Sequence, residues 1–232
     1  MRKIIAAMAL AFTAAGAQAA LVSQTVNFGS TNNLLTSWGE EFSDPVVAVL
    51  LSGAKFDSGY TLTRMDVTIT NHDHQYATVD NVSGSTVTYR ANEGGSGVTD
   101  IFLYDPSGNW TFGDAPIVSS SFDYTNQLAN QTFFVGTHSL GERSQTVIGT
   151  LTFSDTAILA EFSGSGDIDL SVNAYGHTDQ YSGPPNVRFS PNAEASADVV
   201  VTYWYDRPAP EPASLALLGA AAIGFAARRR RG

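Results

Sequence analysis

The 232-residue sequence contains no cysteine. Disulfide bonds, a thiol nucleophile and metal sites built on thiolates are therefore excluded. Catalytic signatures are also missing, because the chain has no Gly-x-Ser-x-Gly elbow, no phosphate-binding loop and no His-Glu-x-x-His motif. His138 and His177 lie near serines, but no motif joins them. We expect a protein that is not an enzyme and needs no cofactor; a hydrolase with paired carboxylates is the enzymatic alternative.

Basic residues are scarce and lie largely at the two ends. The chain has 12 Lys and Arg against 22 Asp and Glu, a net charge of −10. Six of the basic residues (Arg2, Lys3 and Arg228–Arg231) belong to the ends, which hold one acidic residue, Glu211. Residues 20–207 thus carry 21 acidic and 6 basic side chains, net −15. This charge argues against binding nucleic acid and favours solubility, and it leaves association with calcium open.

The N-terminus has the pattern of a secretory signal peptide. Arg2 and Lys3 precede an apolar run, Ile4–Ala15, and an Ala-Gln-Ala triplet then ends at Ala19. Small residues at the end of a short apolar run favour cleavage, here between Ala19 and Ala20, over an uncleaved anchor. We therefore predict a signal peptide over residues 1–19.

The C-terminus has an apolar segment that is charge-free between Glu211 and Arg228. A helix over about 213–227 would be roughly 22 Å long, somewhat short of the bilayer core but able to span a thinned one. A buried core helix is the alternative, which the arginines disfavour because no polar face receives them. We predict a transmembrane helix in the inner membrane with its arginines on the cytoplasmic side.

Residues 208–232 combine three features in a fixed order. The motif Pro210, Glu211 and Pro212 is followed by the apolar segment and by the basic tail Arg228, Arg229, Arg230 and Arg231. This arrangement resembles a PEP-CTERM sorting signal. The resemblance implies a Gram-negative bacterium, a secretion machinery, and an exosortase-type enzyme that removes the helix from a protein associated with exopolysaccharide or biofilm.

Residues 20–207 show the alternation typical of β-strands. In Leu62–Thr70, Met65, Val67 and Ile69 share one face, and polar residues share the other. No window longer than about 12 residues carries a helical apolar stripe. We predict one antiparallel β-sandwich, with a jelly roll as one form of it. Further strands are expected at Gln24–Phe28, Pro45–Leu51, Ser85–Arg90, Thr99–Tyr104, Gln131–Val135, Thr146–Phe153, Ala157–Phe162, Asp167–Ala174 and Asp198–Tyr205.

Glycine-rich and proline-rich segments predict the turns between these strands. Asp105–Gly108 fits a type I turn, and Tyr181–Asn186 predicts a rigid loop. Glu93–Gly97 and Ser163–Gly166 contain glycines, which readily adopt the positive φ angles that reversals or bulges need.

Three segments resemble a second family in order along the chain. They are Phe56–Leu62 with the strand after it, Ala160–Gly166 running into Asp167–Ala174, and Ala197–Tyr205 before the sorting motif. Together they look like the choice-of-anchor E domain of exported bacterial proteins, over about residues 22–206. The resemblance implies a surface domain without an assigned activity, so it identifies no functional residues.

Two pairs of residues are candidate metal ligands. On an extended strand His72 and His74 share a face and could chelate zinc or copper with Asp80, but the stretch to Val79 also reads as a polar loop. Asp167 and Asp169 likewise share a strand face and could bind calcium or act as acid and base. A solvated strand face is the alternative.

Loop aromatics suggest a carbohydrate-binding site, since sugars stack on flat rings beside planar polar partners. The candidates, with polar neighbours at Asn109, Asp179 and Gln180, are Trp38, Trp110, Tyr124, Tyr175 and Tyr181. Core or rim packing is the alternative, and alternation does not decide on which side Trp204 lies. We expect a non-enzymatic surface or matrix protein, with a carbohydrate-binding module as the alternative.

Overall fold

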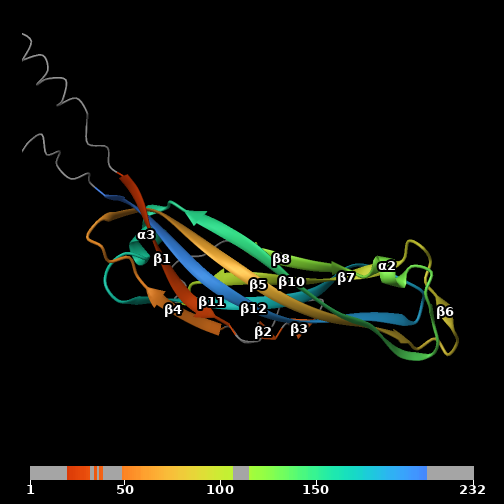
Figure 1. The fold of residues 1–232 in the computed structure, drawn as a ribbon. Coiled ribbons are helices and arrows are strands. Elements are labelled where there is room, and N and C mark those ends of the chain that lie inside the picture. Colours follow the sequence, from red (N-terminus) through yellow and green to blue (C-terminus); the bar gives the residue numbers. More distant parts are fainter. Residues whose placement is uncertain (1–19, 32–33, 36, 39–48, 107–114, 208–232) are drawn as a thin grey trace, which may run out of the picture.

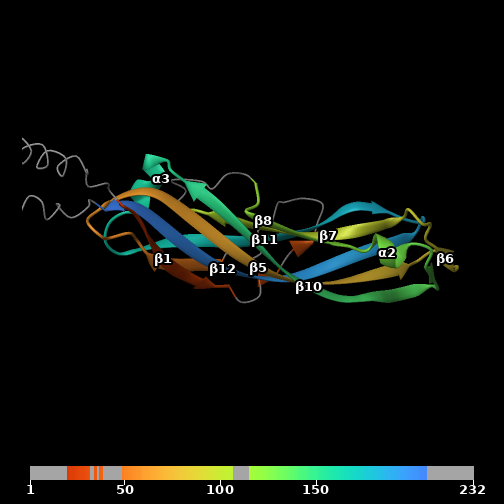
Figure 2. The same ribbon diagram turned by 45° about the horizontal axis from the view of Figure 1, so that its top comes forward.

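The computed structural model describes residues 20–31, 34–35, 37–38, 49–106 and 115–207. These residues form two mainly antiparallel sheets that face one another in an elongated body (Figure 1; Figure 2). The predicted antiparallel β-sandwich is thereby confirmed. The predicted signal peptide, sorting motif, C-terminal helix and basic tail lie outside the described residues.

Sheet A has the strand order β1-β12-β5-β10, and β2 adds a short pairing to β12. All of its pairings are antiparallel. Its two central strands are 21 residues each, long enough to run most of the length of the body (Figure 1). The strand bounds are Ala20–Ser30 (β1), Leu34–Leu35 (β2), Thr61–Asn81 (β5), Gly136–Phe153 (β10) and Val187–Arg207 (β12).

Sheet B has the order β3-β11-β7-β8, with β4 on the same edge of β11 as β3. The two-residue pairing of β3 with β11 is parallel, and the others are antiparallel. The bounds are Ser37–Trp38 (β3), Val49–Ala54 (β4), Gly94–Tyr104 (β7), Val118–Asp123 (β8) and Asp167–Ser182 (β11). A separate pair and two short helices are Val87–Thr88 (β6), Thr132–Phe133 (β9), Thr125–Leu128 (α2) and Thr156–Glu161 (α3).

The chain crosses repeatedly between the two sheets. Leaving the short strands aside, β1, β5, β10 and β12 enter sheet A, whereas β4, β7, β8 and β11 enter sheet B. Four strands in each sheet, joined by crossings of this kind, have the connectivity of a jelly roll. Apart from β7 and β8, which follow one another in the chain, the long strands that pair in each sheet are far apart in sequence.

The inward face of β5 changes character along the strand. Met65, Val67 and Ile69 are fully buried in the larger apolar core, which α3 closes with Leu159. A smaller core at the other end includes Ala77, Val79, Tyr89, Leu128 and Phe189. Between them the same face of β5 carries three buried polar residues, Asn71, Asp73 and Gln75. The sandwich therefore has two apolar cores separated by a polar layer.

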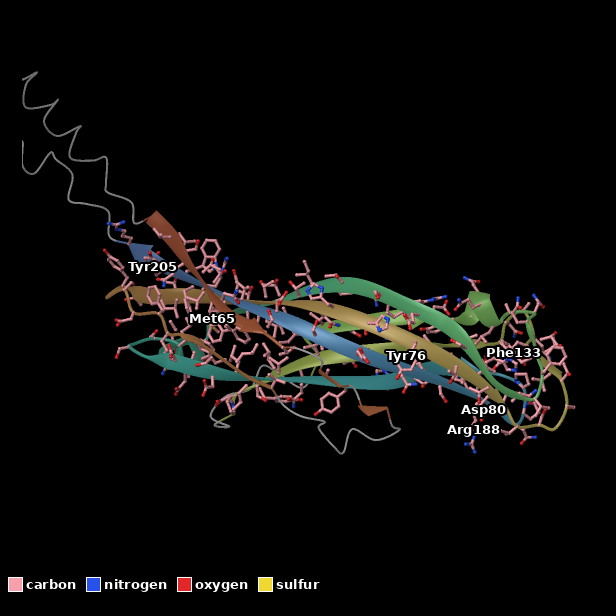
Figure 3. All side chains as sticks on the ribbon, turned by 60° about the horizontal axis from the view of Figure 1, so that its bottom comes forward. Met65, Tyr76, Asp80, Phe133, Arg188 and Tyr205 are labelled. Atoms are coloured by element: carbon pink, nitrogen blue, oxygen red, sulfur yellow. The ribbon has the colours of Figure 1, made fainter. Side chains whose placement is uncertain are left out.

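The ends of the described chain meet at one pole of the body. Ala20, the first residue of β1, pairs with Arg207, the last residue of β12. Figure 3 shows Met65 and Tyr205 toward this pole, with Tyr76, Asp80 and Phe133 progressively farther away. The segments before and after the sandwich therefore leave it from the same end.

Three local predictions are wrong. Ala157–Phe162 was expected as a strand, but Thr156–Glu161 is a helix because Asp155 caps it, accepting hydrogen bonds from the Ala157 and Ile158 amides. Glu93–Gly97 was expected as a turn, but β7 begins at Gly94, where close contact with Thr125 leaves no space for a side chain. The glycines at 164 and 166 do have positive φ, as predicted.

The third wrong prediction concerns the loop proposed after Asn71. The segment through Val79 continues β5 without a break, because β12 pairs with every residue of it and β10 pairs with all of it except Ala77, where the register shifts. Several expected strands are longer in the structure, and β8 and α2 were not predicted. Part of Pro45–Leu51 and part of Asp105–Gly108 lie outside the described residues.

Candidate functional site

His72 and His74 lie on the outward face of β5, as the alternation predicted for an extended strand. Their side chains are 48% and 38% exposed, whereas the intervening Asp73 points inward and is 1% exposed. β10 and β12 flank β5 on either side. The two imidazoles are therefore displayed at the middle of a three-strand surface, with side chains from both neighbours within reach.

Each histidine has a different carboxylate partner. The His72 ring nitrogens lie 3.1 Å from Thr146 Oγ1 on β10 and 3.1 Å from Asp198 Oδ2 on β12. His74 Nε2 lies 3.5 Å from Glu142 Oε2 on β10. The hydroxyl of Ser30 and the imidazole of His72 hydrogen-bond the Asp198 carboxylate and hold its pKa below the usual value.

His72 and His74 share one face of β5, as the metal-site hypothesis requires, but the described residues do not complete a set of metal ligands. No group of three or more His, Asp or Glu side chains in the described part of the chain could hold a metal ion. Asp80, the proposed third ligand, lies six residues farther along β5 than His74 and accepts a hydrogen bond from Thr137. The structure therefore does not bring Asp80 to the histidines.

An open pocket of about 530 Å³ surrounds His72 and His74. Ser144 and Thr146 line it from β10, and Glu194 and Ser196 line it from β12. Glu194 is the cross-strand partner of His74, and Ser196 is the partner of His72. The small side chains of Ser144 and Ser196 leave space beside the larger imidazoles, which accounts for a hollow on the surface of a sheet.

Asp167 and Asp169 lie at the start of β11 and are exposed. Ile168 and Leu170 between and beside them face inward, and Leu170 is fully buried. Their cross-strand partners on β4, Ala54 and Ser52, supply no carboxylate. The arrangement is that of a solvated strand face.

The polar layer between the two cores was not anticipated from the sequence. Asp73 accepts hydrogen bonds from Ser120 Oγ at 2.5 Å, Gln75 Nε2 at 3.0 Å and Thr99 Oγ1 at 3.3 Å. Desolvation raises the pKa of Asp73 despite these bonds. Asn71 Oδ1 and Gln75 Oε1 are buried without a hydrogen-bond partner. The sequence does contain a pattern that indicates this layer. Asn71, Asp73 and Gln75 continue the alternation that places Met65, Val67 and Ile69 on the inward face.

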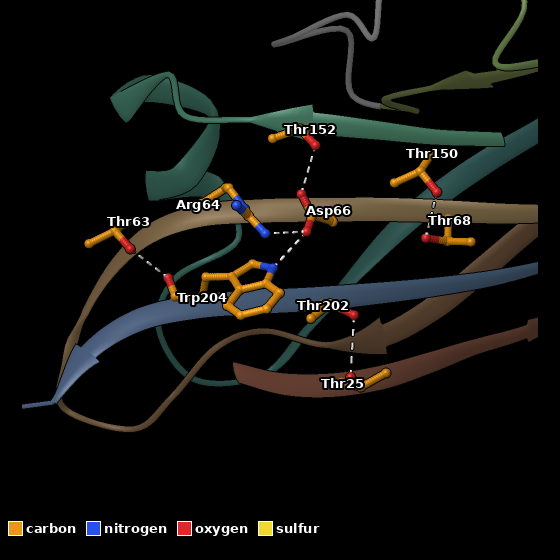
Figure 4. A network of polar contacts seen from close by, with 9 residues as sticks. All are labelled: Thr25, Thr63, Arg64, Asp66, Thr68, Thr150, Thr152, Thr202 and Trp204. Carbon is orange, nitrogen blue, oxygen red and sulfur yellow. Dashed lines mark hydrogen bonds and ion pairs between the residues drawn. The ribbon is translucent and has the colours of Figure 1, made fainter. Parts of the chain in front are cut away.

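A second polar network lies on the outward face of sheet A near the pole where the chain ends meet. Asp66 accepts hydrogen bonds from Trp204 Nε1 at 2.6 Å, Thr152 Oγ1 at 2.8 Å and Arg64 at 2.9 Å (Figure 4). Burial works to raise the pKa of Asp66, but these bonds outweigh it and leave the pKa lowered. The Arg64 guanidinium also lies 4.4 Å from the centre of the Trp204 ring. Trp204 is thus a surface residue, held by polar contacts.

Among the described residues, the loop aromatics proposed as sugar-binding candidates do not form one cluster. Tyr124 is fully buried beneath Arg143, and Tyr181 stacks on Phe189 and bonds Tyr89 and Val187 through its hydroxyl. Tyr175 contacts Phe102 edge-on. Trp110 and Asn109, and the side chains of Trp38 and Gln180, lie outside the described residues; Asp179 is exposed near the end of β11. The three candidates whose side chains the structure describes, Tyr124, Tyr175 and Tyr181, therefore make packing contacts, as the packing alternative predicts.

Within the described parts of the chain, no helix combines the length and apolar character needed to cross a membrane. A protein-family profile described as "PEP-CTERM protein-sorting motif" matches residues 208–231. This motif is a sorting signal that exosortases act on, so the chain is an exported, envelope-sorted β-sandwich protein. The family match confirms the prediction made from Pro210, Glu211 and Pro212.

Comparison with curated proteins finds no match. Among solved structures, the chain is similar to the xylan-binding module CBM15, with 10% identity and a TM-score of 0.22 over 80% of this chain and 97% of that one. It is also similar to a carbohydrate-binding module from Cel9A of Ruminococcus flavefaciens, with 11% identity and a TM-score of 0.20 over 77% and 98%.

A chain of infectious bursal virus T=1 particles gives 9% identity and a TM-score of 0.20 over 82% of this chain. This chain covers 36% of the viral one. Scores this low carry no argument about function.

Proposed function

We propose that this protein is a non-enzymatic component of the cell surface or extracellular matrix. Its sandwich is a domain similar to choice-of-anchor E, displayed outside the inner membrane of a Gram-negative bacterium. An exosortase-type enzyme and the secretion machinery process it, and the mature protein lies in a matrix of exopolysaccharide.

The observation that carries this proposal is the pairing of Ala20 with Arg207 at one pole. The sorting motif begins at residue 208, directly after β12. A tether at this pole leaves both sheet faces and the far tip free for contact with surrounding matrix. Display of an elongated domain from one end suits adhesion or matrix association.

Deletion of residues 210–232 tests the proposal in cells. The truncated protein should appear folded in the periplasm or medium, because all described strands remain. A matched variant with alanine at positions 210–212 keeps the apolar segment and arginines and should stay in the membrane fraction unprocessed. An insoluble or degraded truncation product, or a fully processed alanine variant, would contradict the proposal.

A carbohydrate-binding module is the second candidate. The observation that favours it is the open polar pocket around His72 and His74, where hydroxyl, imidazole and carboxylate groups of three strands face solvent. Such groups are those that hydrogen-bond sugar hydroxyls. Binding to soluble glycans by the purified full-length chain tests this candidate separately from sorting.

A further inference from the structure

We propose that the pocket around His72, His74 and Glu194 binds a polysaccharide containing amino sugars with free ammonium groups. The inference rests on the proposed function, since an exported domain is what meets such a polymer. It goes further by naming the site and the charge of the ligand.

The first argument is that the pocket contains unused hydrogen-bonding groups. Among the described residues, no hydrogen bond or ion pair engages the carboxylate of Glu194 or the hydroxyls of Ser144 and Ser196. His72, in contrast, is held in place by Thr146 and Asp198. A fixed imidazole beside three free polar groups gives a preorganised surface for a polyhydroxylated ligand.

The second argument is charge. None of the described residues that line the pocket is Lys or Arg, whereas Glu194 lines it and Glu142 and Asp198 contact its histidines. Arg143, on β10, is directed inward over Tyr124 and donates to the Asp123 carbonyl. A cationic sugar gains from these carboxylates, and a uronic acid polymer is repelled by them.

The third argument is an exposed ring at the edge of the site. Tyr76 follows His74 on the outward face of β5, is 40% exposed and is the cross-strand partner of Glu142. Figure 3 shows it along the sheet between Met65 and Phe133. The apolar face of a sugar ring can stack on such a side chain while its ammonium group meets Glu194.

The fourth argument favours a glycan over a basic peptide as the ligand. Extended peptides commonly bind by adding a strand to a free sheet edge. β5 is paired with β10 on one side and with β12 on the other over the whole pocket, so its backbone is already used. Recognition here must come from side chains, which suits a ligand rich in hydroxyls.

The test uses the full-length chain purified in a neutral detergent. Calorimetry compares a glucosamine hexamer with an N-acetylglucosamine hexamer, a galacturonic acid hexamer and a lysine trimer. The glucosamine hexamer should bind most tightly, and the acidic hexamer should not bind. Glu194→Gln should weaken glucosamine binding about tenfold, the size of one charge-assisted hydrogen bond. Glu161→Gln, which removes an exposed carboxylate from α3, should have no effect.

Hydroxyl-radical footprinting locates the ligand on the same samples. Tyr76 should be protected by the glucosamine hexamer, while Tyr60 and Tyr181, each 38% exposed, should not change. Equal binding of the lysine trimer, insensitivity to Glu194→Gln, or protection at Tyr60 instead of Tyr76 would overturn the proposal. Because Glu194→Gln leaves the sorting signal intact, envelope fractionation of this variant shows whether the proposed function survives a failure of the binding site.

Discussion

Asp73 is a carboxylic acid placed between two apolar cores, with no Lys or Arg contact among the described residues. Its neighbours in the polar layer are neutral, and alanines at 193, 195 and 197 lie opposite this part of β5. Desolvation raises its pKa, so the native protein binds the proton of Asp73 more tightly than the unfolded chain does. This residue should destabilise the fold increasingly as pH rises.

Asp73→Asn should increase the free energy of unfolding at pH 7 by about 1–2 kcal/mol. The new amide would carry no charge, and it could donate to the unpartnered oxygens of Asn71 and Gln75. In the wild type, the contribution of protonated Asp73 to stability should be fully present below the unfolded pKa and lost as pH rises through the higher native pKa, and the variant should lack this pH-dependent loss. Urea unfolding at several pH values measures it, and a destabilised variant with the wild-type pH slope would contradict the prediction.

Asp66 should show the opposite pH dependence. Hydrogen bonds hold its pKa below the usual value, so its contribution is present above the unfolded pKa and lost as pH falls through the native pKa. Asp66→Asn should cost about 1 kcal/mol at pH 7 and less in acid. The same urea titrations test this, and an equal loss at both pH values would show that the charge is not what matters.

At the scale of elements, α3 shows how one residue decides a local structure. The segment Thr156–Glu161 is only six residues long, too short to be stable by itself. Asp155 caps its first turn, and Leu159 and Phe162 are buried in the larger core. Capping and tertiary packing together therefore override the strand pattern.

Asp155→Ala should lower the free energy of unfolding by about 1 kcal/mol, because two helix amides lose their acceptor. Asp155→Asn keeps an acceptor oxygen and should be nearly neutral. Thermal unfolding of the two variants measures the difference. Equal losses would mean that the charge of Asp155, rather than its cap, stabilises this end of the sandwich.

At the scale of the whole molecule, strand pairing gathers the two ends of the sandwich at one pole. The pocket on sheet A lies away from this pole, on strands whose pairing is complete. Tethering and binding would therefore use separate parts of the surface. Loss of one should leave the other intact.

Mass spectrometry of the envelope-associated protein should show a first residue at Ala20 and a last residue near Glu211. Cleavage after Ala19 follows from the small residues before it, and processing near the Pro-Glu-Pro motif follows from the sorting signal. The alanine variant at 210–212 is the control and should retain its arginine tail. An intact tail on the wild-type protein would indicate a permanent anchor instead.

The sequence alone determined the sorting motif, the β class, and the faces of β5 and β11. These are local properties. The alternation of side chains along a strand shows which residues share a face, but it does not show which strand lies beside them. It also placed His72 and His74 on one face. The polar layer was readable in the same register, at 71, 73 and 75, but it required extending the strand through a segment that reads as a loop.

Only the tertiary structure decided what surrounds these residues. Glu194 is the cross-strand partner of His74 although 120 sequence positions separate them, and Asp198 hydrogen-bonds His72 although they are 126 positions apart. Such pairings depend on how every strand is ordered in the two sheets, which no local pattern specifies. The same is true of the burial of Tyr124 and of the helix at α3, where packing against distant strands outweighed the propensity of the segment.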